Sequence, residues 1–337
     1  MEYRTLGASG LKVSRICLGA MMLGERTDNA VAVRILRSAR EAGVNFIDTA
    51  DTYGEGESER IVGKFVARER DRWVIATKFA SRLVADDPNS GGTSRKWVMQ
   101  AVEGSLKRLG TDYIDVYYFH RDDRATPLEE SLAAMHDLIR TGKVRYFGLS
   151  NICGWRIAEV VERCRALGAP RPIVLQPYYN ALYRLAEVEQ LPACRHYGIG
   201  VVPYSPLARG VLTGKYLPGR KPPADSRAGR GEPRFMETEM RKESLAIAQV
   251  LKRHAERKGM TAAQFALNWT LNNAMVSAVL AGPRTLEQWR EYLGALRHRF
   301  DAEDEALVDR LVAPGHGSTP GYTDPKYPVT GRVRVGA

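Results

Sequence analysis

The sequence has little cysteine and lacks the usual metal motifs. Only four of the 337 residues are cysteines: Cys17, Cys153, Cys164 and Cys194. They form no Cys-x-x-Cys pair, and no His-Glu-x-x-His motif is present. Such scattered cysteines are typical of reduced thiols and argue against a disulfide framework or a zinc site. We therefore expect no metal.

Long hydrophobic runs are also missing. No apolar stretch is long enough to cross a membrane, although the hydrophobic fraction of 44% suffices for a core. The start, Met1-Glu2-Tyr3-Arg4, lacks the basic segment and apolar stretch of a signal peptide. The sequence thus favours a cytoplasmic protein without membrane partners.

The charge is unbalanced, with a formal net value of +11. A basic surface can attract nucleic acid, anionic membranes or phosphorylated small molecules. Nucleic-acid binders usually concentrate positive charge on one element, whereas here the basic residues are mixed with acids, as in Glu237–Lys258. We therefore expect no nucleic-acid partner, and a phosphate-bearing cofactor accounts for part of the excess.

A Gly-x-Gly-x-x-Gly fingerprint is absent, which argues against a doubly wound dinucleotide-binding fold. Instead, short apolar runs alternate with amphipathic stretches. The expected strands are Ile16–Gly19, Asn45–Asp48, Trp73–Thr77, Ile114–Phe119, Val144–Leu149, Ile173–Gln176, Gly200–Pro203 and Val276–Leu280. The expected helices are Asn29–Ala42, Glu57–Arg68, Ser94–Leu109, Leu128–Thr141, Trp155–Leu167, Glu187–Tyr197, Thr261–Asn272 and Leu286–Arg297. Ser94 and Thr261 are expected N-caps.

Eight strand–helix units predict an α/β fold in which a parallel sheet closes as a (β/α)8 TIM barrel. Such a barrel takes about 250 residues, so the rest must be additions to a single domain spanning residues 1–337. We expect a β-hairpin over residues 3–13, two extra helices (one at Glu237–Lys258), and long loops at the carboxyl face. The loops are Phe79–Thr93 and Tyr204–Phe235, and the tail Pro314–Ala337 is expected to be irregular.

Polar side chains gather where function resides in such barrels, at the carboxyl ends of the strands. The segment Val44–Gly54 places Asp48 at a strand end and Tyr53 in the following loop, while Lys78 and His120 follow the next two strands. Each residue alone has a structural explanation, such as a solvated lysine or a hydrogen-bonded histidine. Their convergence indicates proton chemistry.

A tyrosine hydroxyl has an ordinary pKa of about 10, and a nearby ammonium is expected to lower it. Asp48 would keep Lys78 charged, and His120 would polarise a carbonyl oxygen against Tyr53. This is general-acid catalysis at an oxygen that gains negative charge, and it requires a hydride-donating cofactor.

The chain closely resembles the aldo-keto reductases, NAD(P)H-dependent carbonyl reductases on a (β/α)8 barrel. The motifs that carry the resemblance span most of the sequence. They are Asp48-Thr49-Ala50 with Tyr53-Gly54, Thr77-Lys78, His120-Arg121, Gly148-Leu149-Ser150-Asn151, Gln176 with Tyr179-Asn180, Tyr204-Ser205-Pro206-Leu207, Thr213-Gly214-Lys215-Tyr216 and Gly282–Glu291.

The resemblance implies a role for each of these positions. The catalytic set is Asp48, Tyr53, Lys78 and His120, with Tyr53 as proton donor. The cofactor-binding set is Ala20, Met21, Asp48, Ser150, Asn151, Gln176, Tyr204, Ser205, Pro206, Leu207, Arg209, Gly210, Lys215, Arg227, Gly282, Arg284, Gln288 and Glu291. Tyr204 would stack on the nicotinamide. Apart from the resemblance, we expect the substrate pocket to be lined by Met22, Phe79, Tyr118 and Arg121, together with Met21 and the tail.

Arg284 would meet the adenosine 2′-phosphate, which favours NADPH, with NADH as the alternative. Three residues depart from the family pattern: Ala20 replaces a common Thr, Ala281 a frequent Pro, and Tyr292 a usual Asn. The expected activity is reduction of aldehydes or ketones to alcohols. The alternative is a cofactor-sensing subunit like the potassium-channel β subunits of the same superfamily, a branch that carries Asn where this chain has His120. The physiological carbonyl substrate and the oligomeric state stay open.

Overall fold

The computed structural model describes residues 1–329, and eight parallel strands form its main sheet. The strands follow the order β10-β3-β4-β5-β6-β7-β8-β9. Their bounds are β3 (Ile16–Gly19), β4 (Phe46–Asp48), β5 (Val74–Phe79), β6 (Ile114–Phe119), β7 (Val144–Ser150), β8 (Val174–Gln176), β9 (Gly200–Val201) and β10 (Val279–Ala281). Each strand except β10 lies beside its neighbour in sequence, as in a (β/α)8 barrel.

The sheet closes on itself between β9 and β10. The amide of Ser277 donates to the carbonyl of Val201 at 2.9 Å, and that of Leu280 to the carbonyl of Pro203 at 3.1 Å. A parallel bridge also pairs Val201 with Val276, just before β10. The predicted barrel is therefore confirmed. The two strands that close it, β9 and β10, are shorter than the sequence indicated.

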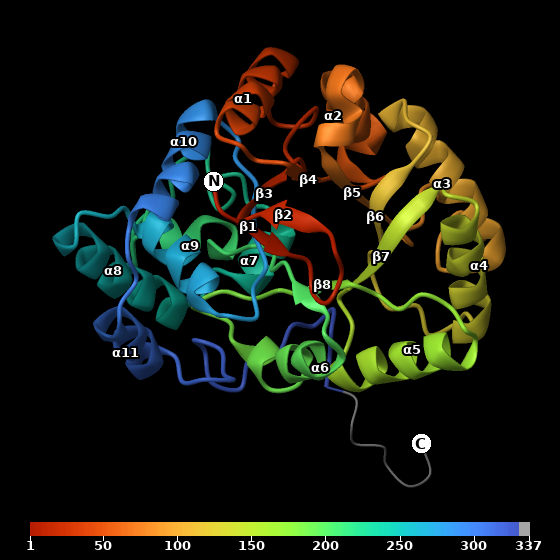
Figure 1. Ribbon diagram of the computed structural model, residues 1–337. Coiled ribbons are helices and arrows are strands. Elements are labelled where there is room, and N and C mark those ends of the chain that lie inside the picture. Colours follow the sequence, from red (N-terminus) through yellow and green to blue (C-terminus); the bar gives the residue numbers. More distant parts are fainter. Residues whose placement is uncertain (330–337) are drawn as a thin grey trace, which may run out of the picture.

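Helices surround the barrel (Figure 1). Those that follow the strands are α1 (Asn29–Glu41), α2 (Glu57–Val66), α3 (Arg95–Leu109), α4 (Leu128–Arg140), α5 (Gly154–Ala166), α6 (Gln190–Tyr197), α9 (Ala262–Asn272) and α10 (Leu286–Gly294). The predicted N-caps are confirmed: the Ser94 hydroxyl accepts from the amide of Trp97, and Thr261 forms a capping box with Gln264. Short 3-10 helices are η1 (Tyr53–Gly56), η2 (Ala67–Arg72), η3 (Leu185–Glu187), η4 (Ala208–Thr213) and η5 (Ala295–Arg297).

The predicted hairpin, β1 (Tyr3–Thr5) and β2 (Lys12–Ser14), closes the amino end of the barrel (Figure 1). Leu6 and Val13 are fully buried in the apolar cluster that fills the barrel. Gly7 has a φ of 61°, and a Cβ there would lie 2.5 Å from the amide nitrogen of Gly200. Only glycine allows this close approach of the hairpin to the barrel.

Three further helices lie outside the repeating pattern. The single helix expected at Glu237–Lys258 is split into the short α7 (Pro233–Thr238) and α8 (Lys242–Arg257). The third, α11 (Ala302–Leu311), was not located from the sequence. Its N-cap is Asp301, whose carboxylate accepts from the amides of Glu303 and Asp304 at 3.1 Å each. No helix within residues 1–329 is both long and apolar enough to span a membrane.

Side chains alternate along the strands between the barrel interior and the surrounding helices. The interior cluster includes Phe46 of β4, Ala76 of β5, and both Val116 and Tyr118 of β6. The same parity points Asp48 and Lys78 inward, two residues beyond Phe46 and Ala76. These polar groups therefore form the floor of a site above an apolar plug.

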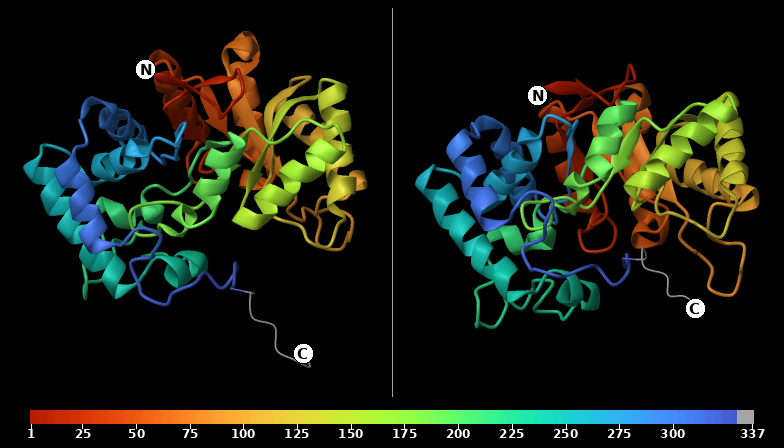
Figure 2. Two further views of the ribbon diagram at one scale, coloured as in Figure 1. Left: turned by 60° about the horizontal axis from the view of Figure 1, so that its bottom comes forward. Right: turned by 90° about the horizontal axis from the view of Figure 1, so that it is seen from below.

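The described part of the tail, residues 314–329, crosses the carboxyl face of the barrel (Figure 2). The amide of Ser318 donates to the carbonyl of Leu182, and the amide of Arg184 to that of His316, both at 2.8 Å. Asp324 forms an ion pair with Arg234. The last eight residues of the expected irregular segment, 330–337, lie outside the described residues.

Candidate active site

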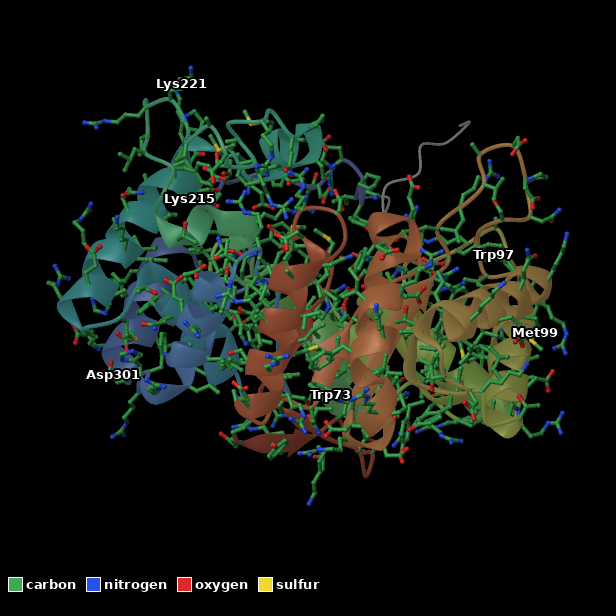
Figure 3. All side chains as sticks on the ribbon, turned by 90° about the horizontal axis from the view of Figure 1, so that it is seen from above. Trp73, Trp97, Met99, Lys215, Lys221 and Asp301 are labelled. Carbon is green, nitrogen blue, oxygen red and sulfur yellow. The ribbon has the colours of Figure 1, made fainter. Side chains whose placement is uncertain are left out.

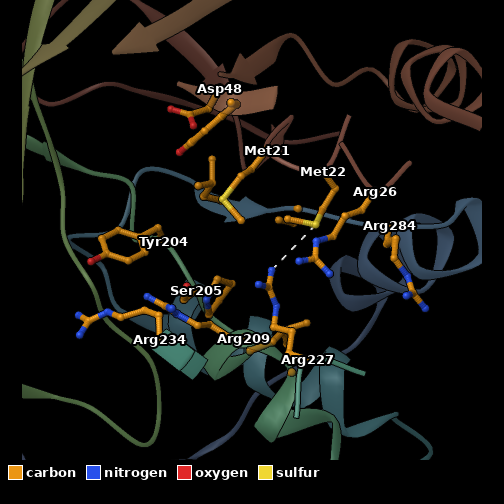
Figure 4. Close-up of a pocket in the computed structure, with 18 of the residues that line it drawn as sticks. Met21, Met22, Arg26, Asp48, Tyr204, Ser205, Arg209, Arg227, Arg234 and Arg284 are labelled. Carbon is orange, nitrogen blue, oxygen red and sulfur yellow. Dashed lines mark hydrogen bonds between the residues drawn. The ribbon is translucent and has the colours of Figure 1, made fainter. Parts of the chain in front are cut away.

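A pocket of about 690 Å³ opens at the carboxyl ends of the strands (Figure 4). The long loop of residues 204–235 forms one of its sides. In Figure 3, Lys215 and Lys221 of this loop lie on the side of the molecule away from Trp73, which precedes β5. Most residues expected at the site line this pocket. They are Met21, Met22, Asp48, Tyr53, His120, Arg121, Ser150, Asn151, Gln176, Tyr204, Ser205, Pro206, Leu207, Arg209, Gly210, Lys215, Arg227, Gly282, Arg284 and Gln288.

Lys78 lies fully buried behind Tyr53. Its ammonium forms an ion pair with Asp48, donates to the carbonyl of Thr49 at 2.7 Å, and donates to the Tyr53 hydroxyl at 3.3 Å. The side-chain amide of Gln176 donates to the second Asp48 oxygen at 2.9 Å. The expected neighbours Asp48, Tyr53 and Lys78 are thus in direct contact.

The electrostatics keep Lys78 charged. Burial lowers the pKa of the ammonium, but Asp48 and Tyr53 more than offset this effect and leave the pKa above its ordinary value. Since a buried charge is tolerated only beside a partner, Asp48 is the group that maintains the cation.

The pKa of Tyr53 corrects one expectation. Burial raises it, the ammonium of Lys78 lowers it, and Asp48 raises it again, with a net increase above the ordinary value. The predicted net lowering is therefore wrong for this state of the protein. The reason is that Asp48 neutralises much of the ammonium charge while the phenolate would lose its water. The phenol accordingly holds its proton at neutral pH.

His120 follows β6 and stands beside Tyr53, with ring centroids 6.1 Å apart and planes at 81°. Burial, followed by the charges of Lys78 and Arg121, lowers its pKa well below the ordinary value. The ring is therefore neutral and carries one N–H donor. Within residues 1–329, its buried Nδ1 has no hydrogen-bond partner.

Amide and hydroxyl groups fix the next part of the floor. The Asn151 side-chain amide donates to the carbonyl of His120 at 2.8 Å, and the Tyr204 hydroxyl donates to the Asn151 oxygen at 2.8 Å. Ser150 donates to the carbonyl of Gln176 at 2.8 Å. These bonds tie together the ends of β6, β7, β8 and β9, so the floor is rigid.

Cations line the opposite part of the pocket. Burial lowers the pKa of Lys215, and the positive charges of Arg284, Arg227 and Arg230 lower it further. The Arg284 guanidinium donates to the exposed carboxylate of Asp225 at 2.8 Å. This density of positive charge favours a bound polyanion.

Glu232 joins the long loop to the connection after β3. Its carboxylate pairs with Arg26 at 2.9 Å, Arg227 at 2.8 Å and Arg230 at 2.9 Å. A long contact of 3.9 Å from Arg227 to the sulfur of Met22 bridges the same gap (Figure 4). The long loop therefore crosses the pocket and is bound to the connection after β3 through Arg26 and Met22.

Two residues expected to contact substrate lie elsewhere. Phe79 is fully buried outside the barrel and stacks on Tyr117 with ring centroids 4.6 Å apart. It follows inward-pointing Lys78 directly, so it points outward. Tyr118 points inward but lies two residues below His120, in the apolar plug. Both predictions are wrong: strand parity turns Phe79 away from the pocket, and Tyr118 lies too deep in the barrel interior to reach it.

Two expected cofactor residues also fail to line the pocket. Ala20 is fully buried between the lining residues Gly19 and Met21. Glu291 lies one position off the face of α10 that carries Gln288 and Tyr292, which are four residues apart on the same side of the helix. Tyr292 therefore occupies the place expected for Glu291.

The pocket also contains residues that sequence reasoning missed. They are Gly19, Arg26, Thr52, Ser81, Thr213, Asp225, Ser226, Arg230, Arg234, Leu267, Leu280, Ala281, Tyr292, Lys326 and Tyr327. Seven of the fifteen belong to the long loop or the tail, where no repeating sequence pattern indicates which way a side chain points. Ser81 and Thr52 follow strand ends and could have been found there. Within residues 1–329 no group of three or more His, Cys, Asp or Glu residues could hold a metal.

Comparison with known proteins agrees with this geometry. An uncharacterized oxidoreductase, YrpG, of Bacillus subtilis is 38% identical over 335 residues, covering 95% of this chain and 98% of its own. A probable voltage-gated potassium channel subunit beta of rice, Oryza sativa subsp. japonica, is 39% identical, with 88% and 91% covered. L-glyceraldehyde 3-phosphate reductase of Escherichia coli K12 is 34% identical, with 94% and 93% covered.

The family model for the aldo/keto reductases matches residues 15–313. This range begins just before β3 and ends just after α11, so it contains the whole barrel and every polar group of the pocket floor. With this match and these relatives, the chain belongs to the aldo/keto reductase family and is an oxidoreductase.

Proposed function

We propose that this protein reduces aldehydes or ketones to alcohols with NADPH, with Tyr53 as the proton donor. One observation carries the proposal: the Lys78 ammonium contacts both the Asp48 carboxylate and the Tyr53 hydroxyl. Because Tyr53 also lines the pocket beside the neutral His120, a carbonyl oxygen entering there would meet two donors.

The pocket has cations that suit the phosphates of a dinucleotide cofactor and polar side chains that suit its nicotinamide. Lys215, Arg227 and Arg284 would hold its phosphates, because guanidinium and ammonium groups bind phosphate oxygens. Tyr204 offers a flat ring for the nicotinamide, and Ser150, Asn151 and Gln176 offer donors and acceptors for its carboxamide. When bound, the cofactor supplies the hydride. Arg284 favours NADPH, and NADH is the alternative.

The backbone near Ser205 supports this assignment. Ser205, Ala208 and Arg209 have φ values of 55°, 45° and 50°, and Gly210 has a φ of 105°. Successive left-handed residues turn the chain sharply where it borders the pocket. Such turns can direct amide groups toward an anion.

The chain's own residues perform the proton transfer. His120 donates a hydrogen bond to the carbonyl oxygen and orients it. Tyr53 gives its proton to that oxygen as negative charge develops on it. Lys78 stabilises the phenolate left behind, and Asp48 keeps Lys78 charged throughout. Electrostatic help of this kind acts strongly in a site that excludes water.

The relatives support two candidate functions. L-glyceraldehyde 3-phosphate reductase supports an enzyme that acts on a small carbonyl compound. The potassium channel subunit beta of rice, at 39% identity, supports a cofactor-sensing role as the second candidate. His120 favours the enzyme, because carbonyl polarisation needs a good hydrogen-bond donor.

The test is to incubate the purified protein with NADPH and a panel of aldehydes and ketones while following nicotinamide absorbance. NADPH binding is measured in parallel by the change in protein fluorescence. We expect substrate-dependent oxidation of NADPH. Tight NADPH binding without turnover of any carbonyl compound would contradict the enzyme and favour the sensor.

A further inference from the structure

A second group of cations lines the pocket, apart from Lys215, Arg227 and Arg284. It consists of Arg121, Arg209, Arg234 and Lys326. Of these four, Arg209 also belongs to the expected cofactor-binding set. Figure 4 shows Arg209 and Arg234 on the side of Tyr204, whereas Arg26 and Arg284 lie beyond Met21 and Met22. Arg209 and Arg234 thus lie on the side of Tyr204, which is expected to stack on the nicotinamide, and Arg121 directly follows His120 in the chain.

Only half of this group is neutralised. Arg209 pairs with Glu239 at 3.5 Å, and Arg234 pairs with Glu237 at 2.8 Å and with Asp324. Within residues 1–329, neither Arg121 nor Lys326 has a carboxylate within 4.0 Å. Among the described residues, this group thus includes two cations without an acidic partner.

These two cations lie near each other and near the reacting groups. Burial lowers the pKa of Lys326, the charges of Arg121, Arg234 and Arg209 lower it further, and the charge of Asp324 offsets part of this decrease. Arg121 and Lys326 also contribute to the low pKa of His120. Like charges gathered at one site are unfavourable, and a bound anion would relieve the repulsion.

Arg121 and Lys326 are held at the pocket by the surrounding structure. Arg121 donates from one guanidinium nitrogen to the hydroxyl of Ser81 at 2.9 Å, and Ser81 is nearly buried. Its remaining N–H groups are available to a ligand. Lys326 is carried by the tail, which is fastened by the ion pair of Asp324 with Arg234 and by Arg241 stacked 3.9 Å from the ring of Tyr322.

An exposed cation is usually just solvated, but this arrangement is more than scattered surface charge. The two cations come from separate segments, the loop after β6 and the tail, yet both border one pocket with Tyr53 and His120. The phosphates of the cofactor do not require them, because Lys215, Arg227 and Arg284 already line the other side.

We propose that the substrate is a small aldehyde or ketone that carries a negatively charged group, a phosphate or a carboxylate, bound between Arg121 and Lys326. This inference rests on the proposed carbonyl reduction. It adds the substrate class, because the pocket that offers donors to the carbonyl oxygen also offers an anion two cations that have no carboxylate partner within residues 1–329.

The test compares matched substrates with the NADPH-loaded protein. Glyceraldehyde 3-phosphate is compared with glyceraldehyde, and 4-carboxybenzaldehyde with 4-methylbenzaldehyde. We expect kcat/KM to be about tenfold higher for the charged member of at least one pair, mainly through a lower KM, because a charge-assisted hydrogen bond contributes about this much. The pair that responds identifies phosphate or carboxylate.

Variants locate the effect. In R121Q and K326Q, the ratio of kcat/KM for the charged over the neutral substrate should fall about tenfold. R68Q is the control: Arg68 is an exposed cation in η2, before β5 and outside the pocket, and its loss should leave the ratio unchanged. Equal ratios in all variants, or equal kcat/KM within both pairs, would overturn the inference while carbonyl reduction stands.

A binding measurement tests the anion site independently of carbonyl reduction, in case the protein turns over none of these substrates. Calorimetry of the NADPH-loaded protein compares glycerol 3-phosphate with glycerol, and 4-carboxybenzyl alcohol with 4-methylbenzyl alcohol. Binding of an anionic alcohol that weakens about tenfold in R121Q and K326Q supports the anion site even without turnover. If neither anionic alcohol binds more tightly than its neutral match, the anion site is refuted.

Discussion

The Lys78 ammonium lies 3.3 Å from the Tyr53 hydroxyl and at the same time pairs with Asp48. One buried cation thus serves two oxygens of different acidity. The ion pair with Asp48 keeps the ammonium charged, and the same ammonium would stabilise the Tyr53 phenolate after proton transfer. In the proposed mechanism, this arrangement would allow Tyr53 to act as an acid although its pKa is raised.

The first prediction concerns Tyr53. The variant Y53F keeps the ring and removes only the hydroxyl, so kcat should fall by about 10²- to 10⁴-fold, the usual contribution of a general acid. The Kd for NADPH, measured by fluorescence titration, should stay within about twofold because the phosphate-binding cations are untouched. Wild-type turnover by Y53F would refute the assignment of the proton donor.

The second prediction concerns Lys78. In K78M the buried Asp48 carboxylate loses its cation, and breaking such a pair costs about 3–5 kcal/mol of unfolding free energy. Urea denaturation measures this loss, and turnover should disappear as well. The double variant D48N/K78M is the control: it removes both charges, so stability should recover in part while activity does not. A double variant no more stable than K78M would contradict a charge effect.

Sequence reasoning located the floor of the site well, because the carboxyl ends of parallel strands must meet. Asp48, Lys78 and His120 follow from the order of strands alone. It failed where it ignored the alternation of side chains within a strand. Phe79 and Tyr118 were expected at the substrate, yet parity and depth place one outside the barrel and the other beneath the floor.

The parts that lack periodicity could not be placed from the sequence. Lys326 and Tyr327 reach the pocket through a tail whose path depends on single contacts, such as the ion pair of Asp324 with Arg234. Nothing in the local sequence selects that pairing. The sign of the Tyr53 pKa shift likewise depends on burial, which the sequence does not provide.

The third prediction concerns cofactor selection by Arg284. Its guanidinium donates to Asp225, so a 2′-phosphate bound there would have to take the place of this carboxylate. R284A should raise the Kd for NADPH more than tenfold, since a charge-assisted contact is lost, and change the Kd for NADH far less. Calorimetric titration with both cofactors measures this. Equal changes would show that Arg284 does not contact the phosphate.

The matched variant is D225N. It removes the internal competitor, so NADPH should bind more tightly, with little effect on NADH. The gain should be small, roughly twofold to fivefold, because the Asp225 side chain is 75% exposed and water screens an exposed pair. Weaker NADPH binding in D225N would instead mean that Asp225 itself supports the cofactor.

The last prediction concerns Asp51, a buried acid that the proposed proton transfer does not use. Its side chain is 2% exposed, and within residues 1–329 neither carboxylate oxygen has a hydrogen-bond partner. Burial, followed by the nearby charge of Glu59, raises its pKa from 3.8 to about 7, although Arg108 acts in the opposite direction. The folded protein therefore binds this proton more tightly than the unfolded chain.

The sign of the pH dependence follows. Stabilisation by the bound proton is fully present below pH 3.8, is lost as the pH rises toward about 7, and is absent above that. D51N removes the titration and should exceed the wild type by about 2–4 kcal/mol near pH 8.5, with the difference shrinking toward pH 5. Urea denaturation across this range measures it. D86N is the control. Because Asp86 is exposed, the difference in unfolding free energy between D86N and the wild type should not change with pH. If D51N and the wild type differ by the same amount at every pH, Asp51 is ionised throughout and its pKa is not raised.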